Sequence, residues 1–201
     1  MEEALIIFVK NPKIEKVKTR LANDIGEENA TKVYRLLQDH TREVAIKAGK
    51  FNALFYGKEI DDEDDWTEEY FDKLIQRKGD LGIKMANAFY QMIKDGFESM
   101  VLIGSDCYDI SEDHIKEAFQ ALQENDVVLG PAEDGGYYLI GMKDFHPRLF
   151  ADKKWSSETV FTDTVTTIEE LGLSYFELEK LSDIDYLKDL ERYPDLMKAV
   201  E

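Results

Sequence analysis

Short apolar runs alternate with longer amphipathic stretches along the chain, and this alternation restricts the possible folds more than any other feature. The runs are rich in β-branched and aromatic residues, as strands are, and cover residues 4–9, 51–55, 100–103, 127–130, 137–141 and 174–177. The stretches carry apolar residues at helical spacing and cover residues 27–48, 80–94, 111–124, 159–171 and, near the C-terminus, 185–192. Strands that alternate with helices predict an α/β sandwich around a mostly parallel sheet.

The segment 127–141 departs from this alternation. Two strand-like runs flank Asp134, Gly135 and Gly136, and no helical stretch lies between them. Strands joined by so short a connection cannot be parallel neighbours. We therefore expect an antiparallel excursion or a sharp bend here, in an otherwise parallel sheet.

The length and charge of the chain exclude several classes of protein. A chain of 201 residues fits one domain, over residues 1–201. Its formal net charge of −18 opposes binding to nucleic acid or to an anionic membrane surface. The apolar run near the N-terminus follows Glu2 and Glu3 and is too short to be a signal peptide or a membrane span.

Cysteine and histidine usage restricts the kinds of metal site. Cys107 is the single cysteine, which excludes an internal disulfide and favours a cytoplasmic location. His40, His114 and His146 lie far apart, and none has a second His or Cys at metal-ligand spacing. Oxygen ligands are therefore expected for any metal.

Asp106 follows an apolar run that ends at Gly104 and Ser105. Ligands of open α/β sheets bind beyond the carboxyl ends of parallel strands, so Asp106 is expected in a cleft. With Asp109 as a second carboxylate it would suit a hard cation such as Mg²⁺. Alternatively, Ser105 and Asp109 cap the next helix and Asp106 only lines a loop.

A basic segment follows the first predicted strand. It carries Lys10, Lys13, Lys16, Lys18 and Arg20, opposed only by Glu15. Arg binds phosphate through two parallel hydrogen bonds and Lys acts as a point charge, so we predict that this segment binds phosphates. The alternative is a solubilising loop whose charges pair with neighbouring carboxylates. Neither a P-loop nor a dinucleotide-binding fingerprint occurs, which argues against an ordinary P-loop ATPase or dehydrogenase.

Three further motifs have both a chemical and a structural interpretation. Asp80, between two glycines, lies before a helix whose N-terminus favours anions, or it only caps that helix. Residues 155–158 contact an acceptor, or Trp155 packs on the sheet edge and a serine caps a helix. Asp183 and Asp185 offer another metal ligand, or they serve as caps.

The segment 130–141 carries the strongest pattern. Gly135 and Gly136 leave the Asp134 carboxylate accessible, and Glu133 adds a second acid that could orient a water or an acceptor hydroxyl. The same residues are also typical of a simple turn, since glycine tolerates positive φ and aspartate bonds its own backbone.

These motifs together resemble those of a known family. In order they are Lys18-Thr-Arg-Leu21, Gly79-Asp-Leu-Gly82, Gly104-Ser-Asp-Cys107, Gly130-Pro-Ala-Glu-Asp-Gly-Gly-Tyr-Tyr-Leu-Ile-Gly141, Trp155-Ser and Asp183-Ile-Asp185. The chain resembles a small bacterial family of glycosyltransferases related to the nucleotide-diphospho-sugar transferases, which have a GT-A-type fold. It is similar, more distantly, to the guanylyltransferases for phospholactate and molybdopterin.

The resemblance implies a Rossmann-like α/β/α sandwich with a mixed, mostly parallel central sheet. It implies that the first strand and its basic loop hold the nucleotide and that an aspartate after a central strand holds the metal. Carried over residue by residue, it assigns Lys18 and Arg20 to phosphates, Asp80 to the neighbourhood of the nucleotide, Asp106 to the metal, and Asp134, Gly135 and Gly136 to the sugar or acceptor.

The sequence thus predicts a glycosyltransferase that uses a nucleotide-diphospho-sugar. Mg²⁺ or Mn²⁺ on Asp106, with Asp185 as a further ligand, would neutralise the leaving diphosphate, and Asp134 or Glu133 would position or deprotonate the acceptor. One alternative is nucleotidyl transfer from a nucleoside triphosphate to a phosphorylated acceptor. Another is a non-catalytic nucleotide-binding module, because Ile14, Glu15 and Tyr108 stand where the family has Pro, Gly and Pro.

Overall fold

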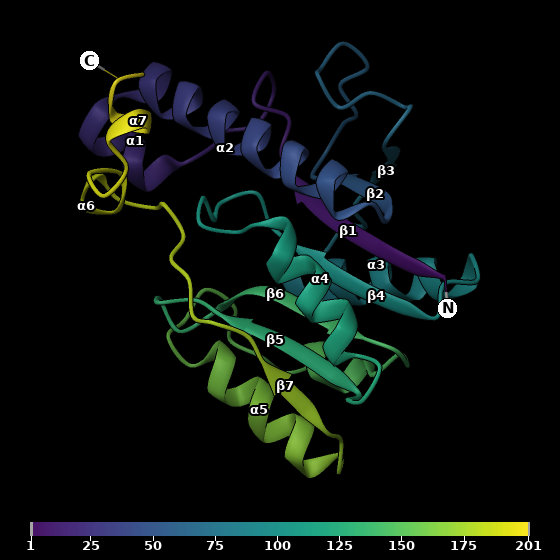
Figure 1. Ribbon diagram of the computed structural model, residues 1–201. Coiled ribbons are helices and arrows are strands. Elements are labelled where there is room, and N and C mark those ends of the chain that lie inside the picture. Colours follow the sequence, from purple (N-terminus) through teal and green to yellow (C-terminus); the bar gives the residue numbers. More distant parts are fainter. Residues whose placement is uncertain (1, 201) are drawn as a thin grey trace.

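A computed structural model describes residues 2–200 and shows one mixed sheet with helices on both of its faces (Figure 1). The strands are β1 (Glu3–Val9), β2 (Phe51–Tyr56), β3 (Asp72–Ile75), β4 (Ser99–Ile103), β5 (Val127–Pro131), β6 (Tyr137–Met142) and β7 (Tyr175–Glu177). The helices are α1 (Thr19–Ile25), α2 (Glu27–Ala48), α3 (Leu81–Lys94), α4 (Glu112–Ala121), α5 (Val160–Glu170), α6 (Leu187–Leu190), α7 (Pro194–Met197) and the 3₁₀ helix η1 (Pro147–Phe150).

The sheet has the strand order β3-β2-β1-β4-β6-β5-β7. Among the strands of residues 2–200, β6 alone runs against the others, and it pairs antiparallel with both β4 and β5. The α/β sandwich with a mostly parallel sheet is therefore confirmed. So is the antiparallel excursion over residues 127–141, in which a register shift at Gly130 and Pro131 accompanies the reversal.

Alternating side chains of the strands build a core on each face of the sheet. On β1, Leu5 and Ile7 join a cluster with residues of α2 and α4. Ala4 and Ile6 point the other way, into a cluster with residues of α3, α5 and η1. A strand buried on both faces consists of a continuous apolar run, which is why these strands could be recognised.

A third apolar cluster joins the two ends of the chain. Leu21 of α1 and Leu37 of α2 pack against Ile184, Leu190 and Leu196. The C-terminal helices, yellow in Figure 1, accordingly lie beside the purple N-terminal ones. Burying a leucine contributes roughly 1.5–3 kcal/mol, so this cluster holds residues 183–185 close to α1.

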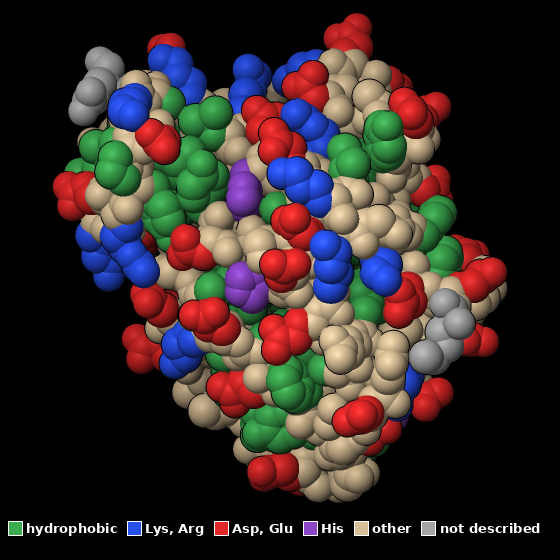
Figure 2. Space-filling model, viewed as in Figure 1, with side chains coloured by type: hydrophobic (Ala, Val, Ile, Leu, Met, Phe, Trp, Pro, Cys, Tyr) green, Lys and Arg blue, Asp and Glu red, His purple; other side chains and the backbone are tan. Residues whose placement is uncertain are grey.

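The surface reflects the acidic composition. Acidic side chains are spread over the face that carries α2 and α4 (Figure 2). Within residues 2–200, no helix combines the length and the apolar character needed to cross a membrane.

Five elements differ from the sequence-based predictions, and one of them is the 3₁₀ helix η1, over which no element was expected. The edge strand β3 was not predicted, because its side chains are partly or fully exposed and show no apolar alternation. Helix α1 begins at Thr19, inside the segment predicted as a basic loop. The helix predicted over 185–192 is the single turn α6, and α7 follows it. Such short elements carry too few residues for a periodic signal.

Candidate functional site

A cavity of about 800 Å³ opens at the carboxyl ends of β1 and β4. It lies where α/β sheets bind ligands. Six of the ten residues proposed from the sequence line it, namely Lys10, Lys18, Arg20, Asp106, Asp134 and Asp185. The other four, Asp80, Glu133, Gly135 and Gly136, are placed nearby but do not belong to the described lining.

The ammonium of Lys18 lies at the centre of an acidic cluster. Its Nζ is 2.7 Å from Oδ1 of Asp106 and 3.5 Å from Oδ1 of Asp185. The first contact is an ion pair without the angles of a hydrogen bond. Desolvation lowers the pKa of Lys18, but the carboxylates, Asp106 first, outweigh it and leave the pKa raised. Lys18 therefore stays charged although its side chain is only 2% exposed.

The backbone of Lys18 is strained. It has φ 46° and ψ 45°, the left-handed conformation, and forms the N-cap of α1. For a residue with a Cβ this conformation costs roughly 1–2 kcal/mol. The Lys18 carbonyl accepts the Ala22 N–H at 2.8 Å, the first hydrogen bond of α1.

The C-terminal segment brings two more carboxylates to the cleft. The Ile184 N–H donates to the carbonyl oxygen of Asp106 at 3.0 Å, and Asp183 forms an isolated antiparallel bridge with Cys107. Desolvation, followed by the charge of Asp106, raises the pKa of Asp183 to about 7. Arg20 Nη1 lies 3.0 Å from Oδ2 of Asp185, so Asp185 contacts two cations.

Tyr34 anchors the loop after β1 to the loop after β4, and sequence reasoning missed it. Its hydroxyl accepts a hydrogen bond from the Lys10 N–H at 2.8 Å and bonds Oγ of Ser105 at 3.1 Å. Gln38 Nε2 donates to the Lys10 carbonyl at 3.1 Å. Because both residues belong to the buried stripe of α2, the sequence pattern gives them no signal beyond that of core residues.

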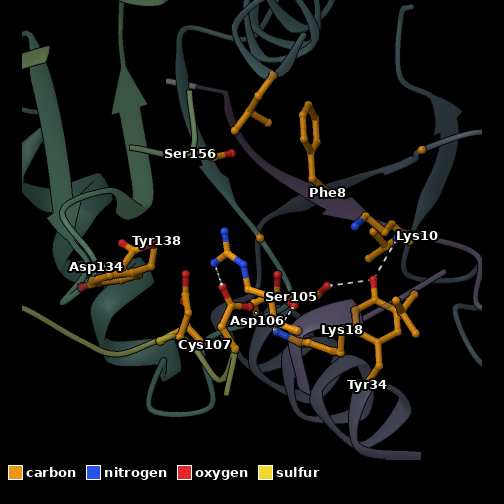
Figure 3. Close-up of a pocket in the computed structure, with 18 of the residues that line it drawn as sticks. Phe8, Lys10, Lys18, Tyr34, Ser105, Asp106, Cys107, Asp134, Tyr138 and Ser156 are labelled. Carbon is orange, nitrogen blue, oxygen red and sulfur yellow. Dashed lines mark hydrogen bonds and ion pairs between the residues drawn. The ribbon is translucent and has the colours of Figure 1, made fainter. Parts of the chain in front are cut away.

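Asp134 lies across the cleft from Lys10 and Tyr34, with Asp106 between the two sides (Figure 3). The Gly136 N–H donates to its Oδ1 at 2.9 Å and orients the carboxylate. Gly135, with φ 87°, passes so close to Glu158 that a Cβ would lie 2.1 Å from the Glu158 carbonyl oxygen. The two glycines therefore shape the loop of Asp134.

Glu133 and Asp80 serve structural contacts. Glu133 Oε2 lies 3.1 Å from Nη1 of Arg192. Asp80 is the N-cap of α3, and its side chain accepts the Ile83 N–H at 2.9 Å. The expectation that Asp80 caps this helix is therefore confirmed. Asp109, considered from the sequence as a second metal ligand, accepts the Tyr193 hydroxyl at 2.6 Å.

The segment 155–158 lines the cavity, but the expected serine cap is wrong, because the N-cap of α5 is Thr159, which makes no side-chain capping bond. Ser156, Ser157 and Glu158 line the cavity. The Trp155 ring packs on Gly82, where a Cβ would lie 2.7 Å from it. This tryptophan is therefore a packing residue, but it packs on helix α3 and not on the sheet edge as expected.

The carboxylates of the cleft suit a hard cation only in combination with a substrate. Within residues 2–200, no group of three or more His, Cys, Asp and Glu is arranged to hold a metal. Mg²⁺ is commonly bound through one or two carboxylates plus substrate phosphates. Asp106, whose side chain is 47% exposed, and Asp185 meet that requirement.

Comparison with known proteins identifies relatives of this chain. The model of the family described as "Uncharacterized protein conserved in bacteria (DUF2064)" matches residues 33–157. No curated protein matches the chain. A crystal structure from Desulfovibrio desulfuricans G20, provisionally named a nucleotide-diphospho-sugar transferase, is 30% identical with a TM-score of 0.88, and the match covers 97% of this chain and 88% of that one.

Two more distant structures share the fold. Rv0371c from Mycobacterium tuberculosis H37Rv, in complex with manganese, has a TM-score of 0.60 at 12% identity, over 97% of this chain and 99% of that one. CMP:2-keto-3-deoxy-manno-octonic acid synthetase, in complex with CTP, has a TM-score of 0.61 at 10% identity, over 98% and 99% of the two chains. The expected nucleotide-diphospho-sugar transferase type of fold is thereby confirmed.

Proposed function

This chain belongs to the bacterial DUF2064 family, and we propose that it is a transferase that binds a nucleotide-diphospho-sugar in its cleft and passes the sugar to an acceptor. The observation that carries the proposal is the convergence of Lys10, Lys18 and Arg20 on the cleft that also holds Asp106. Together with Lys84 and Lys188 they place five basic residues at one cleft of a chain of net charge −18, and although carboxylates line this cleft too, such a concentration of cations favours an anionic ligand. The relative that is 30% identical supports a nucleotide-sugar as that ligand.

Lys18 and Arg20 would bind the diphosphate. The Lys18 ammonium offers a point charge, and the Arg20 guanidinium, half exposed, offers a planar set of donors. Both would stabilise the negative charge that develops on the leaving diphosphate.

Asp106 and Asp185 would hold a divalent cation, Mg²⁺ or Mn²⁺, together with the phosphates. Such an ion, when bound, neutralises part of the charge of the leaving group. The manganese complex of the structural neighbour supports this choice of ion.

Asp134 would orient or deprotonate the acceptor hydroxyl. It lines the cleft with its Oδ1 fixed by the Gly136 N–H, whereas Glu133 is engaged with Arg192. A general base must come within hydrogen-bond reach of the proton it removes, which favours Asp134 over Glu133.

Nucleotidyl transfer is the second candidate, and the similarity to a CTP-bound synthetase favours it. In that reaction a phosphorylated acceptor attacks the α-phosphate of a nucleoside triphosphate, and pyrophosphate leaves. The same cleft residues would serve, so the two reactions separate by their products. Release of a nucleoside diphosphate identifies glycosyl transfer, and release of pyrophosphate identifies nucleotidyl transfer.

Thermal unfolding with nucleotide-sugars, nucleoside triphosphates and diphosphates, each with and without Mn²⁺, tests the proposal. A ligand at a hundred times its Kd adds about 2.7 kcal/mol, which raises Tm by roughly 2–4 °C per kcal/mol in a chain of this size. A largest shift with one nucleotide-sugar supports glycosyl transfer. A shift without turnover of any donor would leave a nucleotide-binding module, and no shift at all would refute a nucleotide site.

A further inference from the structure

We infer that Lys18 acts as the resident cation of the Asp106 and Asp185 carboxylates in the free protein, and that a divalent cation replaces it only after a bound phosphate has drawn its ammonium away. The inference rests on the proposed function and specifies its order of binding. Nucleotide would enter first, and the metal would follow. Lys18 would then be a positioning residue for the metal as well as a phosphate ligand.

The first step is the geometry of the two carboxylates. The Lys18 ammonium is 2.7 Å from Asp106 Oδ1 and 3.5 Å from Asp185 Oδ1, so it occupies the space between them. A Mg²⁺ ion at about 2.1 Å from the same Asp106 oxygen would lie within about 5 Å of Nζ. Two cations that close repel each other, and the burial of the Lys18 side chain, which is only 2% exposed, strengthens this repulsion.

The second step concerns the other carboxylate oxygen. Oδ2 of Asp185 lies 3.0 Å from Nη1 of Arg20. Both oxygens of Asp185 therefore already face a positive charge in the free protein. A metal that arrives alone gains little charge compensation from this residue.

The third step is that Lys18 can leave its position without losing an aligned hydrogen bond. Its buried Nζ has no hydrogen-bond partner of good geometry. Its backbone is in the left-handed conformation, which stores strain. A phosphate oxygen in the cleft would offer the ammonium an aligned, charge-assisted bond, and Asp106 would then be free for the metal.

These relations predict positive coupling between nucleotide and metal. Nucleotide binds weakly without metal, metal binds poorly without nucleotide, and each tightens the other by the same factor. In this order the nucleotide binds before the metal, whereas a site that keeps a resident metal already holds the ion when the nucleotide arrives.

Mn²⁺ titration followed by electron paramagnetic resonance tests the inference on the free protein. Lys18→Met should bind Mn²⁺ at least about tenfold more tightly than the wild type, because the competing charge is gone. Adding Asp106→Asn to Lys18→Met should abolish that gain. The matched control is Lys84→Met, which removes another cleft lysine that does not contact Asp106 or Asp185 and should change Mn²⁺ affinity by less than about threefold.

Equal Mn²⁺ affinity of the wild type and Lys18→Met would overturn the inference. If Lys18→Met does not fold, the wild type decides the question. Its Mn²⁺ affinity, measured with and without saturating CDP, GDP, UDP or ADP and corrected for Mn²⁺ bound to the free nucleotide, should rise at least about tenfold with one of them. An affinity unchanged by a nucleotide that binds would also overturn the inference.

Failure of the proposed function gives a different result. In that case none of the four diphosphates binds, with Mn²⁺ or with EDTA, as calorimetry would show. The comparison of the wild type with Lys18→Met still reports whether the ammonium and the metal compete.

Discussion

The guanidinium of Arg20 lies 3.0 Å from Oδ2 of Asp185, which ties α1 to a residue 165 positions farther along the chain. The two side chains are 50% and 34% exposed. An ion pair this exposed contributes at most about 1 kcal/mol to folding. The ion pair therefore adds little stability, but it holds the Arg20 guanidinium at the cleft.

Arg20→Ala should weaken nucleotide binding about tenfold or more, because a hydrogen bond to a charged group contributes roughly 1.5–3 kcal/mol. Tm without ligand should change little. The matched control is Arg148→Ala, which removes an exposed ion pair with Glu170 outside the described cleft lining. Calorimetry on both variants checks the prediction, and equal loss of affinity in the two would contradict it.

Asp106→Asn should lower turnover at least about hundredfold, since an amide cannot supply the negative charge that a metal ligand needs. The fold should persist, because Asp185 still faces Lys18. Asp113→Asn, on the exposed first turn of α4, is the control. Turnover of Asp106→Asn at the wild-type rate would remove the metal role of this residue.

Asp134→Asn and Glu133→Gln should differ sharply. General-base catalysis contributes roughly 10²–10⁴ in rate, so Asp134→Asn should lower kcat by a factor in that range. Glu133→Gln loses only an exposed ion pair with Arg192 and should keep a kcat within about twofold of the wild type. Steady-state kinetics of the two variants decides between the acids, and the reverse pattern would assign the base to Glu133.

Local patterns were sufficient to predict most of the fold. The helix expected over residues 27–48 is α2, Glu27–Ala48, because its apolar stripe recurs over six turns between Gly26 and Gly49. The edge strand β3 escaped prediction because packing against β2, and not its own pattern, makes it a strand.

The site could be predicted only as a set of separate motifs. Lys18 and Asp106 each follow an apolar strand, so a shared cleft follows from the rule on strand ends. The bridge between Asp183 and Cys107 and the bond between Tyr34 and Ser105 join segments distant in sequence. Such contacts depend on packing across the whole domain, and no spacing in the chain encodes them.

Asp126, which lies outside the described cleft lining, should make the stability of the protein depend on pH. Ser174 donates two hydrogen bonds to Oδ2 of Asp126, from Oγ at 2.7 Å and from N at 2.8 Å, and they lower the pKa of Asp126. A carboxylate with a lowered folded pKa stabilises the protein above its unfolded pKa of about 3.9, and this contribution disappears as pH falls through the folded pKa.

Asp126→Asn should therefore cost about 1 kcal/mol near neutral pH and progressively less below about pH 4. Urea denaturation across this range measures the difference from the wild type. Ser174→Ala, which keeps the backbone donor, should show a smaller loss with the same pH trend. A difference that does not vary with pH would show that the charge of Asp126 contributes nothing.

Gly135 offers a test of how tightly the loop of Asp134 is held. Gly135 and Gly172 both have positive φ, 87° and 68°, but a Cβ at Gly172 would meet nothing within 4 Å. Gly172→Ala should therefore cost only the backbone strain, about 1–2 kcal/mol. Gly135→Ala adds a clash with the Glu158 backbone and should cost about 1–3 kcal/mol more. Urea denaturation of the pair separates strain from clash. If the two variants are equally stable, the 155–158 segment yields to the added methyl, and the position of Asp134 then depends on its bond to the Gly136 N–H rather than on that segment.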